Sequence, residues 1–139
     1  MRAFVLDASA LLRFMDKERG SERVRSLFRK AARAEIQLLM SAVNWGEVVH
    51  AVTRRSGSGA PRILDSLAAL PMAIVPVDAQ NATDAGQFQA RYGVPYADSS
   101  AAALTMRRQA GVDVTLVTAD NDFRRVPAGT MRIEFLPGK

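Results

Sequence analysis

The chain has 139 residues, 48% of them hydrophobic, which is enough for one compact domain that builds its own core. Cysteine is absent and His50 is the only histidine, which excludes a disulfide scaffold, a zinc–thiolate site and a cysteine nucleophile and disfavours a Ser-His-Asp triad. Lysine and arginine outnumber aspartate and glutamate by 19 to 14, which gives a net charge of +5. This balance favours polyanionic partners, usually nucleic acid, although a GC-rich coding bias toward arginine would produce the same composition.

Residues 3–6 form a short apolar run that ends at Asp7. This run is too short for the apolar segment of a secretion signal, and no stretch of the sequence approaches the roughly 18 apolar residues of a membrane-spanning helix. We therefore expect a cytoplasmic protein without a membrane segment, and a single domain over residues 1–139.

The first half of the chain alternates apolar runs with segments of helical periodicity. Residues 3–6 and 36–40 predict buried strands. Residues 20–34 predict a helix with one apolar face and a strongly basic remainder, and Ser41 predicts the start of a helix that ends near residue 53. Glycine, serine and proline at 56–61 mark a break, after which another helix begins.

The second half continues the alternation. Residues 72–77, 112–118 and 131–135 predict strands. Asp78 predicts the start of a helix that ends near Gly93, and a further helix is expected over 96–110, stopped by Gly111. This order of elements predicts an α/β fold, a parallel sheet of about five strands flanked by helices.

Three aspartates lie just beyond the ends of predicted strands. Asp7 comes after the first strand, and Asp120 and Asp122 come after the fourth. Because the carboxyl ends of parallel strands meet at the edge of the sheet where α/β proteins bind ligands, these aspartates are candidate site residues. Each of them also fits a local role: taken alone, Asp7 fits a helix cap better than a site residue, and Asp120 and Asp122 fit a helix cap or an Asx turn as well as a site.

Asp98 opens the predicted helix 96–110 and shares its face with small residues. Small side chains let a helix pack closely, so we expect this carboxylate on the buried side of the helix. A buried charge needs a partner, a cation or a raised pKa. The positive end of the helix dipole contributes only ~0.3–1 kcal/mol.

Glu47 lies about 150° around its predicted helix from the apolar stripe of Trp45, Val48, Val49 and Val52. This position is compatible with a solvated surface glutamate. Helical side chains lean toward the N-terminus of their helix, however, so Glu47 is also able to reach back to the edge that carries Asp7 and Asp120.

Several carboxylates gathered at one edge repel each other unless they are protonated or bind a divalent cation. Because cysteine is absent and histidine occurs once, the ligands would be oxygens, which suit Mg²⁺ or, as a substitute, Mn²⁺. Such a cation generates a nucleophile from water and stabilises phosphoryl oxygens. With the basic composition, this pattern predicts phosphodiester hydrolysis.

Four segments carry a resemblance to a known family, namely residues 5–12, 41–47, 96–99 and 118–123. In this order, in a small chain, they resemble the PIN domain family, and within it the VapC-type ribonuclease toxins of bacterial toxin–antitoxin pairs. The resemblance covers essentially the whole chain. Ser9 stands where threonine is also usual and Ser99 where alanine is very common, and neither departure removes a carboxylate.

The resemblance implies a metal-dependent endoribonuclease that binds Mg²⁺ or Mn²⁺ and leaves 5′-phosphate and 3′-hydroxyl ends. It assigns the catalytic acids to Asp7, Glu47, Asp98 and Asp120. Of these, the three aspartates are the expected metal ligands, and Glu47 is expected to act through water. It assigns supporting roles to Ser9, Thr118 and Asp122.

The resemblance also implies an RNA substrate, a homodimer and a VapB-type antitoxin that covers the pocket. Candidate contacts to RNA phosphates are Arg23, Arg29, Arg54 and Arg55. His50 is compatible with orienting Glu47, touching substrate or a plain surface position. The Trp45 stripe and the face of Leu27 and Phe28 are compatible with core or with an interface.

Two other functions fit parts of the pattern. Aspartyl-phosphate chemistry also uses an aspartate after a first strand, but Ser9 stands where a second acid is common and none of the three lysines is well placed late in the sheet. A catalytically silent PIN-like module that binds RNA or acts as a scaffold would share the fold. Such modules usually lose one or more of the acids, and this chain retains all of them.

Overall fold

The computed structural model describes residues 1–109 and 112–138. It confirms the α/β class, with five parallel strands in the order β3-β2-β1-β4-β5. The strands are β1 (Ala3–Leu6), β2 (Gln37–Ser41), β3 (Ala73–Val75), β4 (Val114–Thr118) and β5 (Arg132–Phe135). The observed strands agree with the predicted ones to within two residues at each end.

The described residues form six α-helices and two short 3₁₀ helices. The α-helices are α1 (Ala8–Met15), α2 (Ser21–Ala32), α3 (Ala42–Ser56), α4 (Ala60–Ala68), α5 (Ala79–Tyr92) and α6 (Tyr96–Arg108). The 3₁₀ helices are η1 (Gly57–Gly59), at the predicted break, and η2 (Asn121–Arg125). The predicted end of the helix at Ala110 and Gly111 lies outside the described residues. Across the described ranges, none of the helices is long and apolar enough to cross a membrane.

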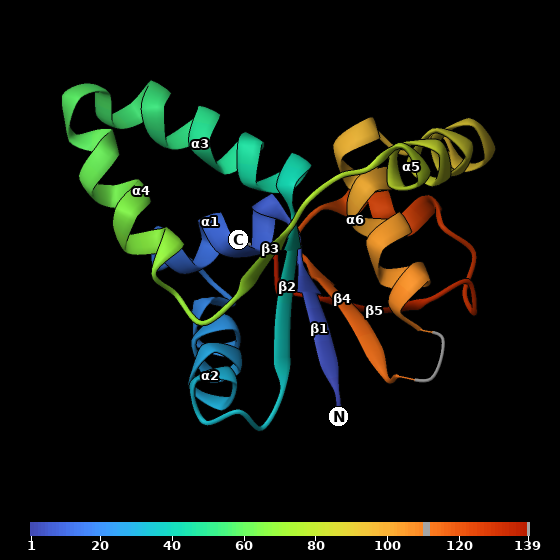
Figure 1. Cartoon of the computed structure of the whole chain (residues 1–139), viewed down its shortest axis with the longest axis horizontal. Helices are drawn as coiled ribbons and strands as arrows, with labels where there is room; N and C mark the ends of the chain where they lie inside the picture. The colour runs from blue at the N-terminus through green and yellow to red at the C-terminus, as the bar shows by residue number, and fades with distance from the viewer. Residues whose placement is uncertain (110–111, 139) are drawn as a thin grey trace.

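Helices cover both faces of the sheet, and β1 is buried between them (Figure 1). Successive strand residues point to opposite faces, so Phe4 and Leu6 join the core formed with α1 to α4. Ala3 and Val5 join the second core, which contains residues of α6 and α5. A strand buried on both sides is typical of parallel sheets and explains the continuous apolar run at the start of the chain.

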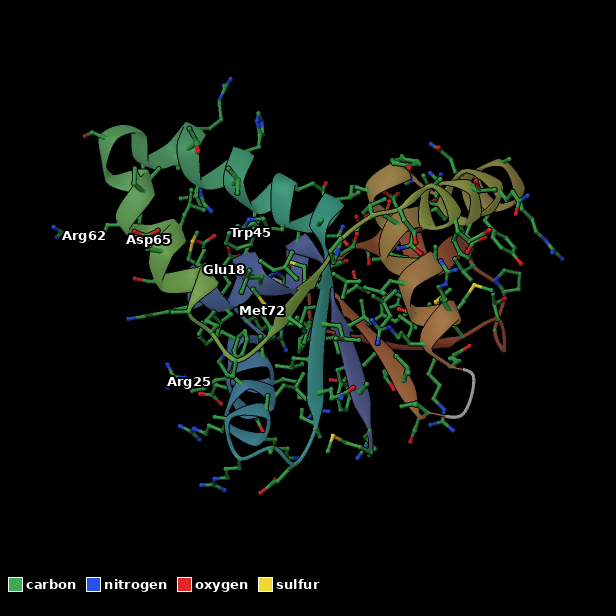
Figure 2. The ribbon with its side chains drawn as sticks, viewed as in Figure 1. Glu18, Arg25, Trp45, Arg62, Asp65 and Met72 are labelled. Carbon is green, nitrogen blue, oxygen red and sulfur yellow. The ribbon has the colours of Figure 1, made fainter. Side chains whose placement is uncertain are left out.

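Helices α3 and α4 form an arm that extends from the sheet (Figure 1). Trp45 and Met72 lie inside the angle of this arm, whereas Arg62 points outward from α4 (Figure 2). Val48 and Val52 of the Trp45 stripe are buried in the core, as are Leu27 and Phe28. Both faces therefore belong mainly to the core of this chain. Of the two roles that the sequence left open, core and interface, the structure supports the core.

The strand order places a topological switch point beside β1. From β1 the chain moves to β2 and β3 on one side, and it returns to β4 on the other side. In open α/β sheets, ligands bind at the carboxyl ends of the strands where the order reverses. Here that crevice lies between the ends of β1 and β4, which are the strands that Asp7 and Asp120 follow.

Candidate active site

Four acids from four different elements surround one cavity at the carboxyl edge of the sheet. The cavity has a volume of about 570 Å³, and Asp7, Glu47, Asp98 and Asp120 all line it. Asp7 follows β1, Glu47 projects from α3, Asp98 lies in the first turn of α6, and Asp120 precedes η2. The structure thus brings together the four residues that the sequence predicted as catalytic.

Asp7 is 2% exposed, and both of its carboxylate oxygens accept hydrogen bonds. One oxygen accepts from the Ser9 hydroxyl at 2.6 Å and from the Ala10 backbone N–H at 3.0 Å. The other oxygen accepts from the hydroxyl of Thr118. The bond to Ala10 caps the N-terminus of α1, so Asp7 has the local capping role and also faces the shared cavity.

The hydroxyls of Ser9 and Thr118 connect Asp7 to the turn after β4. The Ser9 oxygen accepts the backbone N–H of Ala119 at 2.9 Å, and the Thr118 oxygen accepts the backbone N–H of Asp120 at 2.9 Å. Each hydroxyl therefore donates its proton to Asp7 and accepts one from the backbone. Burial raises the pKa of the Asp7 carboxyl to about 6, against the lowering effect of these hydrogen bonds.

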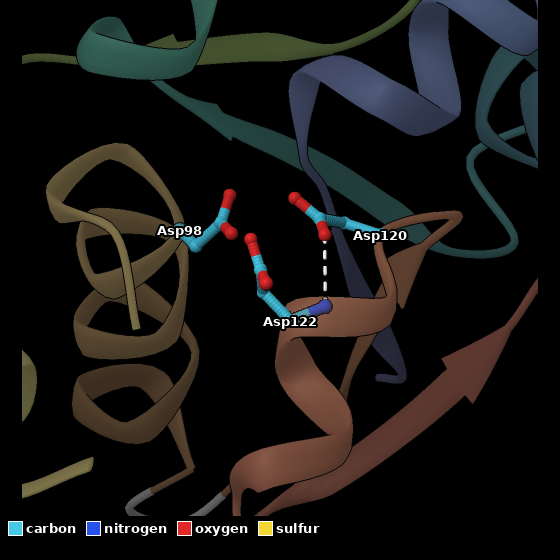
Figure 3. A group of neighbouring side chains, drawn as sticks. All are labelled: Asp98, Asp120 and Asp122. Atoms are coloured by element: carbon cyan, nitrogen blue, oxygen red, sulfur yellow. Dashed lines mark hydrogen bonds between the residues drawn. The ribbon is translucent and has the colours of Figure 1, made fainter. Parts of the chain in front are cut away.

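Asp98, Asp120 and Asp122 form the tightest group of carboxylates (Figure 3). One oxygen from each lies within 4.8 Å of the others. Asp120 accepts the backbone N–H of Asp122 at 2.9 Å, which closes the first turn of η2 and fixes these two acids relative to each other. Asp122 is also 3.9 Å from the guanidinium of Arg125.

Asp98 is the acid whose charged form is least well compensated. It is 6% exposed, and its Oδ2 atom is buried without a hydrogen-bond partner among the described residues. Burial raises the pKa of Asp98 to about 8, and so do the neighbouring carboxylates of Asp120, Asp7 and Glu47. Without a cation, this carboxyl holds its proton at neutral pH.

Glu47 is solvent-exposed yet borders the cavity, so both sequence interpretations hold in part. Its Oε1 atom accepts a hydrogen bond of 3.1 Å from Nδ2 of Asn44. Asn44 is fully buried and was missed by the sequence analysis, although it stands one helical turn before Glu47. No local pattern singles it out, because its second partner is the backbone carbonyl of Ala97 on another helix.

The donor set fits a hard divalent cation. The acids offer only carboxylate oxygens, and one of these oxygens is buried without a partner. Mg²⁺ and Mn²⁺ prefer such ligands, and a cation removes the repulsion that raises the pKa of Asp98. Asp98, Asp120 and Asp122 are the closest set, while Asp7 approaches the same cavity from β1.

A second, larger cavity of about 930 Å³ adjoins the acidic one. The two share Ser9, Leu12, His50, Ala51 and Asp120, so they form one continuous groove. The outer part is lined by arginines of α1 and α3, namely Arg13, Arg54 and Arg55. Arg55 pairs with Asp16 at 2.9 Å, whereas Arg54 has no ion-pair partner in the described part of the chain.

The two other predicted RNA contacts lie away from the groove, on α2. Arg23 makes a bidentate ion pair with Glu134 at 2.7 and 2.9 Å. Arg29 belongs to the last turn of α2, which runs antiparallel to the strands toward the amino edge of the sheet (Figure 1). The structure therefore places Arg54 and Arg55 in the groove that adjoins the acids, whereas Arg23 and Arg29 line neither part of it.

Solved structures of similar fold include bacterial toxin–antitoxin proteins. VapBC2 from Rickettsia felis, bound to a DNA fragment from its promoter, matches with a TM-score of 0.73 and 15% identity over 97% of this chain and 99% of that chain. DNA-bound VapBC from Salmonella typhimurium matches with a TM-score of 0.70 and 20% identity over 97% and 98% of the two chains. The sarcin–ricin loop cleaving toxin VapC20 from Mycobacterium tuberculosis matches with a TM-score of 0.61 and 18% identity over 87% and 92%.

At these identities, the structural likeness shows a common fold. No curated protein matches the sequence at a significant level. The profile of the PIN domain family matches residues 4–129, a range that contains all the acids of the cavity. Because this match covers most of the sequence, the chain belongs to the PIN domain family.

Proposed function

We propose that the chain is a divalent-metal-dependent endoribonuclease and the toxin of a toxin–antitoxin pair. The observation that carries this proposal is the buried Oδ2 atom of Asp98, which has no hydrogen-bond partner among the described residues and belongs to a group of three facing carboxylates. A carboxylate in such a position favours a bound cation over an ionised, uncompensated state. The fold similarity to VapBC proteins supports the toxin assignment.

The cation is Mg²⁺, and Mn²⁺ can substitute for it. Asp7, Asp98 and Asp120 would hold it, with Asp122 beside them. When bound, the cation supplies a water of lowered pKa and an electrophile for the phosphoryl oxygens of RNA. Asp98 and Asp7 release their protons on binding, because metal ligands must be deprotonated.

The remaining residues orient these groups. Ser9 and Thr118 donate to both oxygens of Asp7 and so restrict the direction in which its remaining lone pairs point. Glu47 borders the cavity from α3 with an exposed carboxylate. In this mechanism Glu47 holds the attacking water and accepts its proton while the bond between phosphorus and the 3′-oxygen breaks. The leaving 3′-oxygen takes a proton from solvent water, so the products carry 5′-phosphate and 3′-hydroxyl ends.

The groove supports RNA as the substrate. It leads from the acids along α3 to Arg54 and Arg55, and a single strand lying in it would place its scissile phosphate at the acids and a neighbouring phosphate at the arginines. Arg54 is the stronger candidate, because Arg55 already pairs with Asp16. Contacts from Arg23 and Arg29 stay predictions that require RNA to extend beyond this groove.

The partner in this proposal is a VapB-type antitoxin that covers the acidic cavity and inhibits cleavage. The toxin acts as a homodimer in the cytoplasm. Support comes from solved VapBC structures, in which one chain has the same fold and is matched over 99% and 98% of its length. The basic net charge of +5 agrees with an RNA substrate.

The test is cleavage of a total RNA pool by the purified, antitoxin-free protein with Mg²⁺, with Mn²⁺ and with EDTA. Asp98→Asn is the test variant, and Asp65→Asn is the matched control because Asp65 is an exposed carboxylate on α4 (Figure 2). We expect cleavage that needs metal, is lost in Asp98→Asn and is retained in Asp65→Asn. Fragment ends are mapped in the same experiment.

Two outcomes contradict the proposal. A folded, metal-loaded protein that binds RNA without cutting any of it is the catalytically silent PIN-like module instead. Cleavage that persists with EDTA and in Asp98→Asn means that the activity does not arise from these acids.

A further inference from the structure

Asn44 joins the two walls of the acidic cavity. It lies in the first turn of α3 and is fully buried. Its Nδ2 atom donates to Oε1 of Glu47 at 3.1 Å and to the backbone carbonyl of Ala97 at 3.1 Å. Ala97 belongs to α6 and immediately precedes Asp98. One amide group therefore connects the element that carries Glu47 to the turn that carries Asp98.

The orientation of this amide follows from its neighbours. Both contacts are oxygens without a proton to donate, so the amide nitrogen must face them and the amide oxygen cannot. Both Nδ2 hydrogens are thereby used, while the Oδ1 atom has no hydrogen-bond partner in the described ranges. Asn44 is thus anchored through its donors, which aspartate, the isosteric residue, lacks.

Glu47 depends on this contact for its position. Its side chain is exposed and has three rotatable bonds, so an unrestrained carboxylate would sample many orientations. Within the part of the chain that the structure describes, Asn44 is its hydrogen-bond donor. The donor of this bond is a fully buried amide, so water does not compete for the Asn44 nitrogen.

We infer that Asn44 is a positioning residue of the active site, which fixes the carboxylate of Glu47 against the first turn of α6. This role rests on the proposed function, because the value of an oriented Glu47 lies in holding water near the cation. Groups that support metal-site residues in this way are commonly worth about 10- to 100-fold in metal affinity or activity.

A purely structural role for Asn44 makes a different prediction. If the amide only ties α3 to α6, its loss harms the protein equally whether or not residue 47 is a carboxylate. If the amide acts through Glu47, removing it lowers kcat and Mn²⁺ affinity only slightly once residue 47 is no longer a carboxylate. A double-mutant cycle separates these two cases, because it measures the interaction rather than the sum.

The experiment measures kcat for RNA cleavage and, without RNA, Mn²⁺ affinity by calorimetry in Asn44→Ala, Glu47→Gln and the double variant. We expect Asn44→Ala to lower kcat by about 10-fold or more. In the Glu47→Gln background the same change should cost less than about twofold, and Mn²⁺ affinity should show the same pattern. Equal losses in both backgrounds overturn the inference.

Thr105→Val is the matched control. Thr105 is fully buried on α6 and donates to the carbonyl of Ala101 at 2.9 Å, so the variant loses a buried hydrogen bond away from the acids. We expect it to lower stability without changing kcat or Mn²⁺ affinity. A loss of kcat in Thr105→Val equal to that in Asn44→Ala would attribute the effect to general damage and overturn the inference.

A measurement that keeps Asn44 in place covers the case in which Asn44→Ala does not fold. In ¹H–¹⁵N spectra, Glu47→Gln should shift one of the two Nδ2 proton resonances of Asn44 and leave the other, which bonds to Ala97, in place. If neither resonance moves, the contact does not exist in solution and the inference fails. Failure of the wild type to bind Mn²⁺ or cut RNA instead overturns the proposed function, and the resonances still decide the contact.

Discussion

The hydroxyl of Thr118 donates a hydrogen bond to the carboxylate of Asp7, and the two residues are 111 positions apart in the sequence. The contact joins the carboxyl ends of β4 and β1, which are neighbours in the sheet. The same Thr118 oxygen accepts the backbone N–H of Asp120. One small side chain therefore sets the orientation of one acid and the backbone position of another.

Thr118→Val keeps the shape of this side chain and removes its hydroxyl. Because the Asp120 N–H loses its acceptor and Asp7 loses a donor, we expect the free energy of unfolding to fall by about 1–3 kcal/mol. The hydrogen bond from Thr118 lowers the pKa of Asp7, so its loss raises that pKa further. Mn²⁺ affinity should then fall more at pH 6 than at pH 8, which calorimetry at the two pH values measures.

Thr118→Ser is the control for this prediction, since it keeps the donor and the acceptor. It should retain Mn²⁺ affinity at both pH values. If the serine and valine variants lose affinity equally, the methyl group rather than the hydroxyl is what matters at this position.

The raised pKa values make the stability of the metal-free protein depend on pH. Asp98 and Asp7 keep their protons in the folded state up to pH values of about 8 and about 6, whereas unfolded aspartates release theirs near pH 4. Between these pH values the folded state binds more protons than the unfolded state. The free energy of unfolding therefore falls as pH rises, by up to about 1.4 kcal/mol per pH unit for each group.

Thermal unfolding in EDTA at pH 5, 7 and 9 checks this expectation. The unfolding temperature should decrease from pH 5 to pH 9, and Mg²⁺ should restore most of the loss at pH 9, because it binds the deprotonated folded state. A metal-free protein that is most stable at pH 9 would show that the acids are not buried as the structure has them.

Asp98→Asn should separate stability from function. The amide is neutral at every pH and can donate to Asp120, so it removes the uncompensated charge that Asp98 carries when ionised. In EDTA at pH 8, urea unfolding should show a gain of about 1–3 kcal/mol over the wild type. At pH 5, where Asp98 is protonated, the gain should be small.

The sequence located three acids because their positions follow from local rules. Asp7 and Asp120 lie within two residues of strand ends, and Asp98 opens a helix whose buried face is made of small residues. The parallel order of β1 and β4 then brings them to one edge, as the alternation of strands and helices predicts. For Glu47 the sequence could not decide between a surface position and a site position. A helical wheel gives the direction of the side chain but not which other element faces it.

Other features depend on contacts that no local pattern encodes. Arg23 looks like any exposed arginine in the sequence, yet it pairs with Glu134, 111 residues away. Asn44 looks like a neutral helix residue, and its importance appears only when α6 packs against α3. Arg54 and Arg55 are adjacent in sequence, but of the two only Arg55 pairs with an acid among the described residues.

This difference between two neighbouring arginines gives the last prediction. Arg54 is exposed, lines the outer groove and has no ion-pair partner among the described residues, so its guanidinium is available to an RNA phosphate. Arg54→Ala should raise KM for RNA cleavage while leaving kcat nearly unchanged, because the contact is made equally in ground state and transition state. The slope of log affinity against log salt should shrink by about 0.7, the value for one phosphate contact to a single strand.

Arg62→Ala is the matched control, since Arg62 points outward from α4 (Figure 2) and should leave both KM and the salt slope unchanged. If the two variants change the salt slope equally, RNA responds to the overall charge of the protein rather than to this groove, and the path along α3 is wrong.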